Sequence, residues 1–132
     1  MEPAWVDGLK VSIIVCDREG KILFLNSTAA RQYAKDGGSA LVGKNLRDCH
    51  KADSKEKIAQ LIAEARPNHY TITKKGRKRI IHQMPWFEDG RCAGLVELAM
   101  DIPDELPHFD RDQQAEAQQN ALPRVPRPKD QR

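Results

Sequence analysis

The sequence predicts an α+β domain, in which a five-stranded antiparallel sheet carries helices packed on one face. Three observations lead to this fold class. Residues 78–87 and 92–101 are two β-rich runs around the Asp89-Gly90 turn, which is a strong hairpin signal. Two shorter β-rich runs open the chain, and a helical region separates them from the third. The hairpin is too apolar to stand alone, so we expect other elements to cover it.

The expected order of elements is two strands, short helices, one longer helix and three strands. Residues 11–16 and 21–25 are predicted to pair around a turn at 17–20. Asn26 or Ser27 can cap a short helix over residues 28–35. The third strand, residues 69–75, leads through Gly76 into the hairpin.

The longer helix is predicted over residues 54–65. Asp53 can cap it, and Glu56 occupies the capping-box position three residues later. Pro67 ends it, because the residue before a proline avoids the α region. One apolar stripe runs along this helix at the i, i+3, i+4 and i+7 positions, formed by Ile58, Leu61, Ile62 and Ala65.

Length and composition indicate one domain with a polar tail. The chain has 132 residues. We expect residues 1–10 to form a short N-terminal cap segment and residues 11–103 to form the domain. Residues 104–132 are rich in Gln and Pro and hold few large apolar groups, so we expect a largely disordered tail. Residues 110–121 of this tail are predicted to form a marginal helix at most.

Charge and cysteine usage restrict the setting in which the protein works. The formal net charge of +3 lacks the basic excess of a dedicated nucleic-acid binder. Three cysteines without a C-x-x-C pair fit a reducing cytoplasm. No apolar run is long enough for a signal peptide or a membrane span. We therefore predict a soluble cytoplasmic protein that binds neither nucleic acid nor membrane.

Several short motifs accompany this element order. Asp17 precedes a Gly turn at the end of the first strand, Gly43-Lys44-Asn45 lies in the helical region, and the last strand ends with Met100-Asp101-Ile102. Together they make residues 5–103 resemble the PAS (Per-Arnt-Sim) sensory domain, which often closes with Asp-Ile-Thr before a signalling helix. The resemblance implies the PAS fold. It does not imply a ligand, because PAS domains share a shape and differ in what they bind.

A flavin cofactor is not expected. Light-sensing flavin PAS domains carry a Gly-x-Asn-Cys-Arg motif whose cysteine attacks the flavin. Leu46 stands at that position here and has no nucleophilic group, while Cys49 lies three residues later. The flavin-contacting glutamine of the last strand falls at Ala99.

Haem remains an alternative cofactor. Oxygen-sensing haem PAS domains usually carry a histidine on the longer helix, and residues 54–66 contain none. The C-x-x-C-H attachment motif is absent as well. Cys49 and His50 are candidate axial ligands, since thiolate and imidazole both bind haem iron. The alternative interpretation is a buried small cysteine beside a surface histidine.

Other chemistry finds little support in the sequence. No nucleophile elbow, phosphate loop or paired carboxylate constellation occurs, so we predict that the protein is not an enzyme. No metal site is predicted either, because the cysteines and most histidines lack ligand-like spacing; these residues are Cys16, Cys49, Cys92, His50, His69 and His82.

Strand alternation divides the side chains of the sheet between two faces, and the resemblance to flavin PAS domains selects the face toward the pocket. Arg79, Gln83 and Glu97 make this pocket unusually polar. They hold either a small polar metabolite or an internal Arg79–Glu97 ion pair without a ligand. The full set of predicted pocket residues is Ile14, Cys16, Cys49, His50, Thr71, Thr73, Arg79, Ile81, Gln83 and Glu97.

The opposite face is predicted to be a continuous apolar patch with Trp86 at its centre, joined by Tyr70, Ile72 and His82. Such a patch must be covered, in part by the N-terminal segment and otherwise by a second copy of the chain. The predicted dimer interface consists of Trp5, Val6, Leu9, Ile80, Met84, Trp86, Val96, Leu98 and Met100. A one-residue slip in a strand would exchange the two faces.

The leading hypothesis is a small PAS-type sensory and signalling module. It binds a small ligand, mediates homodimerisation and protein–protein interaction, or does both. A haem-based redox or gas sensor using Cys49 or His50 is one alternative, and a ligand-free interaction module is the other. No effector domain is recognised, so the output is expected to pass through an unidentified partner protein or through the tail.

Overall fold

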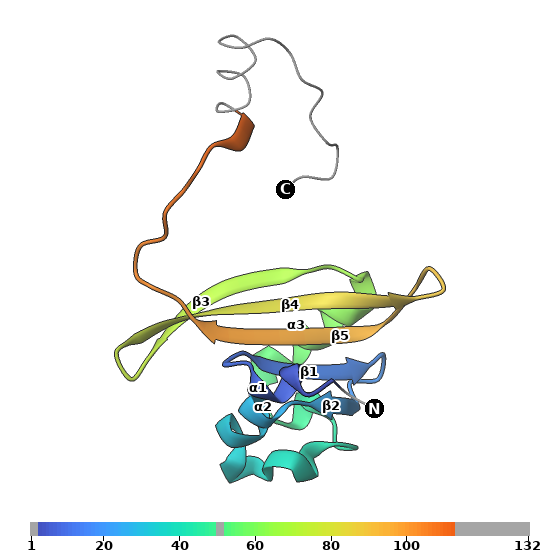
Figure 1. Ribbon diagram of the computed structural model, residues 1–132. Coiled ribbons are helices and arrows are strands. Elements are labelled where there is room, and N and C mark those ends of the chain that lie inside the picture. The colour runs from blue at the N-terminus through green and yellow to red at the C-terminus, as the bar shows by residue number, and fades with distance from the viewer. Residues whose placement is uncertain (1–2, 50–51, 113–132) are drawn as a thin grey trace.

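The computed structural model describes residues 3–49 and 52–112 (Figure 1). A single five-stranded sheet has the order β2-β1-β5-β4-β3, and every neighbouring pair is antiparallel. The strands are β1 (Ser12–Asp17), β2 (Ile22–Leu25), β3 (Asn68–Lys74), β4 (Arg77–Glu88) and β5 (Arg91–Asp101). The predicted fold class is therefore confirmed, including all five strands.

The helical elements lie between β2 and β3, apart from α1 at the N-terminus. They are α1 (Trp5–Gly8), α2 (Ser27–Gln32), α3 (Ala52–Glu64) and the 3₁₀ helices η1 (Ala34–Asp36), η2 (Gly38–Leu41) and η3 (Leu46–Cys49). In Figure 1, α3 lies behind the strands, and the chain leaves the sheet after β5.

The hairpin between β4 and β5 forms as the Asp-Gly signal predicts. Asp89 and Gly90 both have positive φ, at 52° and 80°, as a two-residue type I′ turn requires. Lys75 and Gly76 repeat this conformation between β3 and β4. The second turn leaves Lys74 opposite Arg77, and this pairing sets the register of β3 along its whole length.

The core forms where α3 packs on the sheet. The predicted apolar stripe is confirmed for Ile58, Leu61 and Ile62, which are all buried. They form one cluster with Ile14 and Leu95 from the strands. Helix α3 ends at Glu64 because Ala65 adopts a left-handed conformation and Pro67 follows.

The short helix predicted over residues 28–35 divides into two pieces. α2 ends at Gln32, and Tyr33 leaves the α region with φ −105° and ψ 28° before η1 begins. Tyr33 packs against the core, so tertiary packing overrides the local helical pattern here. The marginal helix predicted over residues 110–121 falls mostly outside the described residues.

Gly94 permits a close approach between β5 and β1. A Cβ atom at this position would overlap the carbonyl oxygen of Cys16 and lie 2.8 Å from the Cα atom of Asp17. The φ of Gly94 is 155°, which side chains rarely allow. Trp86 stands opposite Gly94 in the ladder. Its indole Nε1 donates a hydrogen bond to the same Cys16 carbonyl at 3.0 Å.

No helix within the described ranges is both long enough and apolar enough to cross a bilayer.

Gly94→Ala should lower the free energy of unfolding by about 3 kcal/mol or more, because β1 and β5 must separate to admit the methyl group. Gly8→Ala is the matched control, since nothing lies within 4 Å of a Cβ at that position. Chemical denaturation of both variants measures the effect. A Gly94→Ala variant as stable as Gly8→Ala would contradict the close approach.

Candidate functional site

One face of the sheet, called the inner face below, is the face that α3 covers. Ile81 and Ala99 are buried on it, as are Gln83 and Glu97. Their neighbours along each strand, such as His82 and Leu98, point the other way and are only half-buried. The division of β4 and β5 between the two faces is therefore as predicted.

The predicted division of β3 is wrong by one residue. Thr71 pairs with Ile80 and Thr73 with Lys78, so both threonines lie on the outer face rather than in the pocket. Tyr70 and Ile72 pair with Ile81 and Arg79 and so share the inner face, although they were expected on the outer one. The two-residue turn at Lys75-Gly76 is the physical cause, because it pairs even-numbered residues of β3 with odd-numbered residues of β4.

A row of polar side chains crosses the inner face from β3 to β5. The Nδ2 amide of Asn68 donates to Gln83 Oε1 at 2.9 Å. The Nε2 amide of Gln83 donates in turn to Glu97 Oε2 at 3.0 Å. The three residues stand directly opposite one another in the ladder. Asn68 was not among the predicted site residues, although the register set by the turn places it there.

The row ends on a buried carboxylate. Glu97 is 6% exposed and Gln83 is 4% exposed. Within the described residues, Gln83 is the one hydrogen-bond partner of the Glu97 carboxylate. A neutral amide satisfies one oxygen without balancing the charge, so this part of the inner face retains capacity for a further donor.

Tyr70 lies on the same face, and the negative charge of Glu97 affects its pKa. Burial, followed by the negative charge of Glu97, raises the pKa of the Tyr70 phenol above its ordinary value. The phenol therefore keeps its proton at neutral pH and can serve as a hydrogen-bond donor. Tyr70 is 43% exposed and Ile72 is 38% exposed, so the described residues leave the β3 end of the inner face accessible to solvent.

The remaining predicted strand residues of the pocket belong to the core. Cys16 is fully buried, and Ile14 is 2% exposed. Both pack in the apolar cluster with α3, next to the polar row. Ile14 pairs with Glu97 and so marks where the polar row meets the core.

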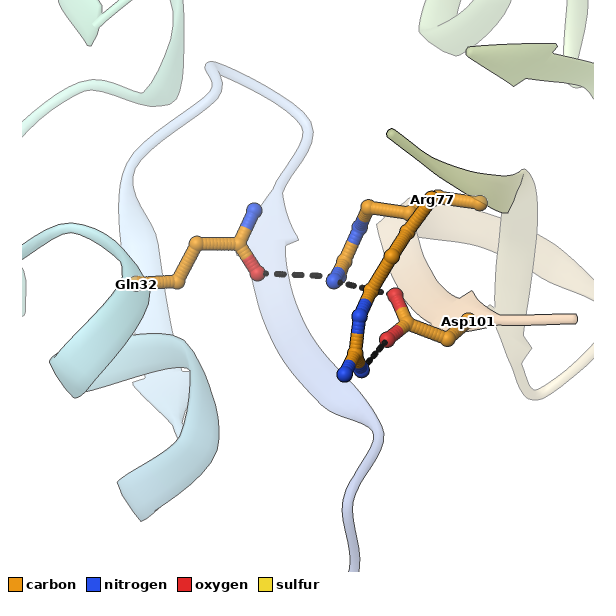
Figure 2. Close-up of polar contacts among 4 residues, drawn as sticks. Gln32, Arg77 and Asp101 are labelled. Atoms are coloured by element: carbon orange, nitrogen blue, oxygen red, sulfur yellow. Dashed lines mark hydrogen bonds and ion pairs between the residues drawn. The ribbon is translucent and has the colours of Figure 1, made fainter. Parts of the chain in front are cut away.

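Arg79 does not pair with Glu97, which corrects the predicted ion pair. Its guanidinium Nη1 lies 2.9 Å from Asp101 Oδ1, and Nη2 donates to Gln32 Oε1 of α2 at 3.1 Å. Arg77 binds the second Asp101 oxygen at 3.0 Å, as Figure 2 shows. Arg79 stands opposite Asp101 in the ladder, whereas Glu97 stands opposite Gln83, which explains both pairings.

The predicted haem ligands lie at the edge of what the structure describes. His50 is outside the described residues, and for Cys49 the description covers the backbone within η3 but not the side chain. A nearby open groove of about 340 Å³ is lined by Asn45, Asp48, Lys55, Glu56 and Ala59. Four of its five lining residues carry polar or charged side chains.

The outer face carries a broad apolar surface. β4 contributes Ile80 and Met84 to this face, and both residues are half-buried. Ladder partners place Val96, Leu98 and Met100 of β5 on this face together with Ile13 and Val15 of β1 and Phe24 of β2. Trp86 lies toward the β4–β5 turn rather than at the centre of this surface, because it pairs with Gly94 and bonds to Cys16.

The N-terminal segment is fixed near the start of α2. Val6 is buried, whereas Trp5 and Leu9 are 63% and 38% exposed. Asp7 Oδ1 accepts from the Ser27 backbone N–H at 2.8 Å, which attaches α1 to α2. The role predicted for this segment in an interface stays a prediction.

Comparison with protein families identifies a match over most of the chain. A family model described as PAS fold matches residues 6–106. No curated protein matches the chain in sequence.

Solved structures of PAS domains share the fold at low sequence identity. The PAS domain of the histidine kinase ThkA is 18% identical with a TM-score of 0.56, over 69% of this chain and 98% of that one. The PAS domain of BvgS from Bordetella pertussis is 18% identical with a TM-score of 0.55, over 89% and 90%. The Aer2 receptor from Vibrio cholerae, described as a dual PAS-heme oxygen sensor, is 21% identical with a TM-score of 0.54, over 74% and 99%.

Glu97→Gln should lower the pKa of Tyr70 while leaving it above the ordinary value, since the charge is removed and the burial stays. Tyrosinate absorbance in an alkaline titration measures this, and Tyr70→Phe assigns the signal, because Tyr33 is the one other tyrosine. The raised pKa also means that the Tyr70 contribution to stability is present below the unfolded pKa of tyrosine and is lost as the pH rises through the folded pKa. An unchanged Tyr70 titration in Glu97→Gln would contradict the effect of the Glu97 charge on Tyr70.

Proposed function

This chain belongs to the PAS family, and we propose that it is a sensory module that binds a small polar ligand at the inner face of its sheet. We propose that it acts by binding and signalling rather than by catalysis. The observation that carries the proposal is the buried Glu97 carboxylate, with its single described donor Gln83.

The chemistry of this carboxylate indicates the class of ligand. A buried carboxylate is stable when donors surround it, and a charge left without them costs several kcal/mol. An amine or hydroxyl group of a ligand would supply those donors. The phenol of Tyr70 and the amide of Asn68 offer further polar contacts beside it. We therefore propose a small ligand that carries amine or hydroxyl groups.

Strand β5 connects the proposed ligand site with the segment of the chain that follows the sheet. β5 runs from Glu97 to Asp101, where two arginine side chains of β4 hold its carboxylate. Arg79 also reaches Gln32 of α2 (Figure 2), so the contacts at this end of the sheet connect β4 and β5 with α2. A ligand that shifts β5 would change these contacts, and thereby the path of the chain after Asp101.

The outer face supports the proposal that the module works as a homodimer. Its apolar side chains extend over four strands, β2, β1, β5 and β4, and are half-buried rather than covered. A two-fold interface places the same surface on both copies, and an apolar surface can pack against a copy of itself. The predicted interface residues Ile80, Met84 and Leu98 would lie in such a contact.

A haem-based sensor is the second candidate. The observation favouring it is the shared fold with the Aer2 receptor, whose description names haem. In this chain Cys49 or His50 would supply the axial ligand. A ligand-free interaction module is the remaining alternative, and it would use the outer face alone.

Wild-type protein should carry a small molecule that Glu97→Gln loses, because the carboxylate no longer binds the donor group. Native mass spectrometry of the purified proteins measures this, and Glu88→Gln is the control, since Glu88 is an exposed carboxylate on β4. A Glu97→Gln variant that is more stable to denaturant than wild type, with no small molecule on either protein, would contradict the ligand proposal.

An absorbance spectrum with and without added haemin separates the second candidate from the first. We expect a spectrum without bands at wavelengths longer than the tryptophan absorption. A sharp Soret band that disappears in Cys49→Ala or His50→Ala would instead establish haem sensing.

Met84→Glu should reduce the affinity of the homodimer at least tenfold, because it places a charge in the proposed apolar contact. Sedimentation equilibrium measures the association. Val42→Glu is the control, since Val42 is 50% exposed and follows η2, outside the sheet. Equal association of both variants and wild type would exclude the outer face as the interface.

A further inference from the structure

Two histidines meet on the outer face, on neighbouring strands. His69 of β3 stands directly opposite His82 of β4. Their Nδ1 atoms are 2.8 Å apart, and the ring centroids are 5.0 Å apart with an angle of 71° between the planes. The two histidines are 13 positions apart in the sequence, a spacing that is no known metal-binding motif, so the pair is not visible in the sequence alone.

The geometry of this pair resembles two ligands that share one cation. The close Nδ1 contact needs a proton on one nitrogen and a lone pair on the other. A metal ion can replace that proton and accept a lone pair from each nitrogen. Two nitrogens bound to tetrahedral zinc at about 2.0–2.1 Å lie about 3.3 Å apart, so the rings must separate by roughly half an ångström. His69 is exposed and His82 half-buried, so both rings have room to adjust.

Among the described residues, the surroundings of the pair supply no further metal ligand. Within residues 3–49 and 52–112, no group of three or more His, Cys, Asp or Glu side chains is placed to hold a metal ion. Ile80 and Met84 flank His82 on its own strand, and Leu98 stands opposite it on β5. The buried carboxylate of Glu97 lies on the other face. The described part of one chain therefore offers two imidazoles, half of the four ligands of a tetrahedral site.

We infer that His69 and His82 form half of a binding site for a divalent transition-metal ion, and that the same pair from a second copy completes it. This inference rests on the proposed homodimer through the outer face. A two-fold axis beside the pair brings four imidazoles together. Imidazole favours zinc, copper and nickel, whereas calcium and magnesium prefer oxygen ligands. The ion would then link the two copies and make their association depend on metal.

The test uses the full chain without a polyhistidine tag. Equilibrium dialysis against Zn²⁺ gives the metal content per chain, and sedimentation equilibrium with and without Zn²⁺ gives the dimer affinity. We expect one zinc ion for every two chains and at least a tenfold gain in dimer affinity. His69→Gln and His82→Gln should each lose both effects. His108→Gln is the matched control that should keep them, since His108 is exposed and lies after β5, outside the sheet.

The possible outcomes separate this inference from the proposed dimer. A dimer that forms equally well without Zn²⁺ and binds none would overturn the metal site and leave the dimer intact. One zinc ion for every chain, with unchanged association, would overturn the sharing of the site. A protein that stays monomeric with and without Zn²⁺ would overturn both. Circular dichroism of the His69→Gln and His82→Gln variants shows that their losses do not come from unfolding.

Discussion

The structure depends on one buried amide, that of Asn26. This side chain is fully buried and uses all four of its hydrogen-bonding positions. Its Nδ2 donates to the carbonyls of Val6 and Val11 at 2.9 and 2.8 Å. Its Oδ1 accepts from the backbone N–H groups of Ile13 and Ala29 at 3.1 and 3.0 Å. One residue at the end of β2 thereby caps α2, holds α1 and anchors the start of β1, and an apolar substitute would leave four backbone groups unsatisfied.

With the strands fixed in this way, the two faces of the sheet acquire different properties. The inner face is apolar where α3 packs on β1 and β5, and polar where Asn68, Gln83 and Glu97 align. The outer face is apolar over four strands and polar at β3, where His69 lies. Ligand binding and association would thus use opposite faces of the same strands, and β5 takes part in both. This arrangement offers a short physical connection between the two events.

Much of the fold was predictable from local signals in the sequence. The Asp89-Gly90 pair specified a hairpin because Gly and Asp tolerate positive φ, and the structure has it there. The stripe of Ile58, Leu61 and Ile62 specified the buried side of α3.

The candidate site was less predictable from the sequence than the fold. Alternation along the strands grouped Gln83 with Glu97, and the resemblance to flavin PAS domains selected the inner face for this group. Thr71 was assigned to the wrong face, because its face depends on a turn outside its strand.

The sequence by itself determined the elements and the alternation within each strand, since both follow from the conformational preferences of neighbouring residues. Tertiary structure decided which strands stand opposite each other and which side chains therefore meet. Arg79 was expected to bind Glu97. It binds Asp101 instead, because the ladder places Arg79 opposite Asp101. The pair of His69 and His82 exists for the same reason. Cross-strand contacts depend on register, and register is fixed by turns and by packing of the whole sheet rather than by the residues that come into contact.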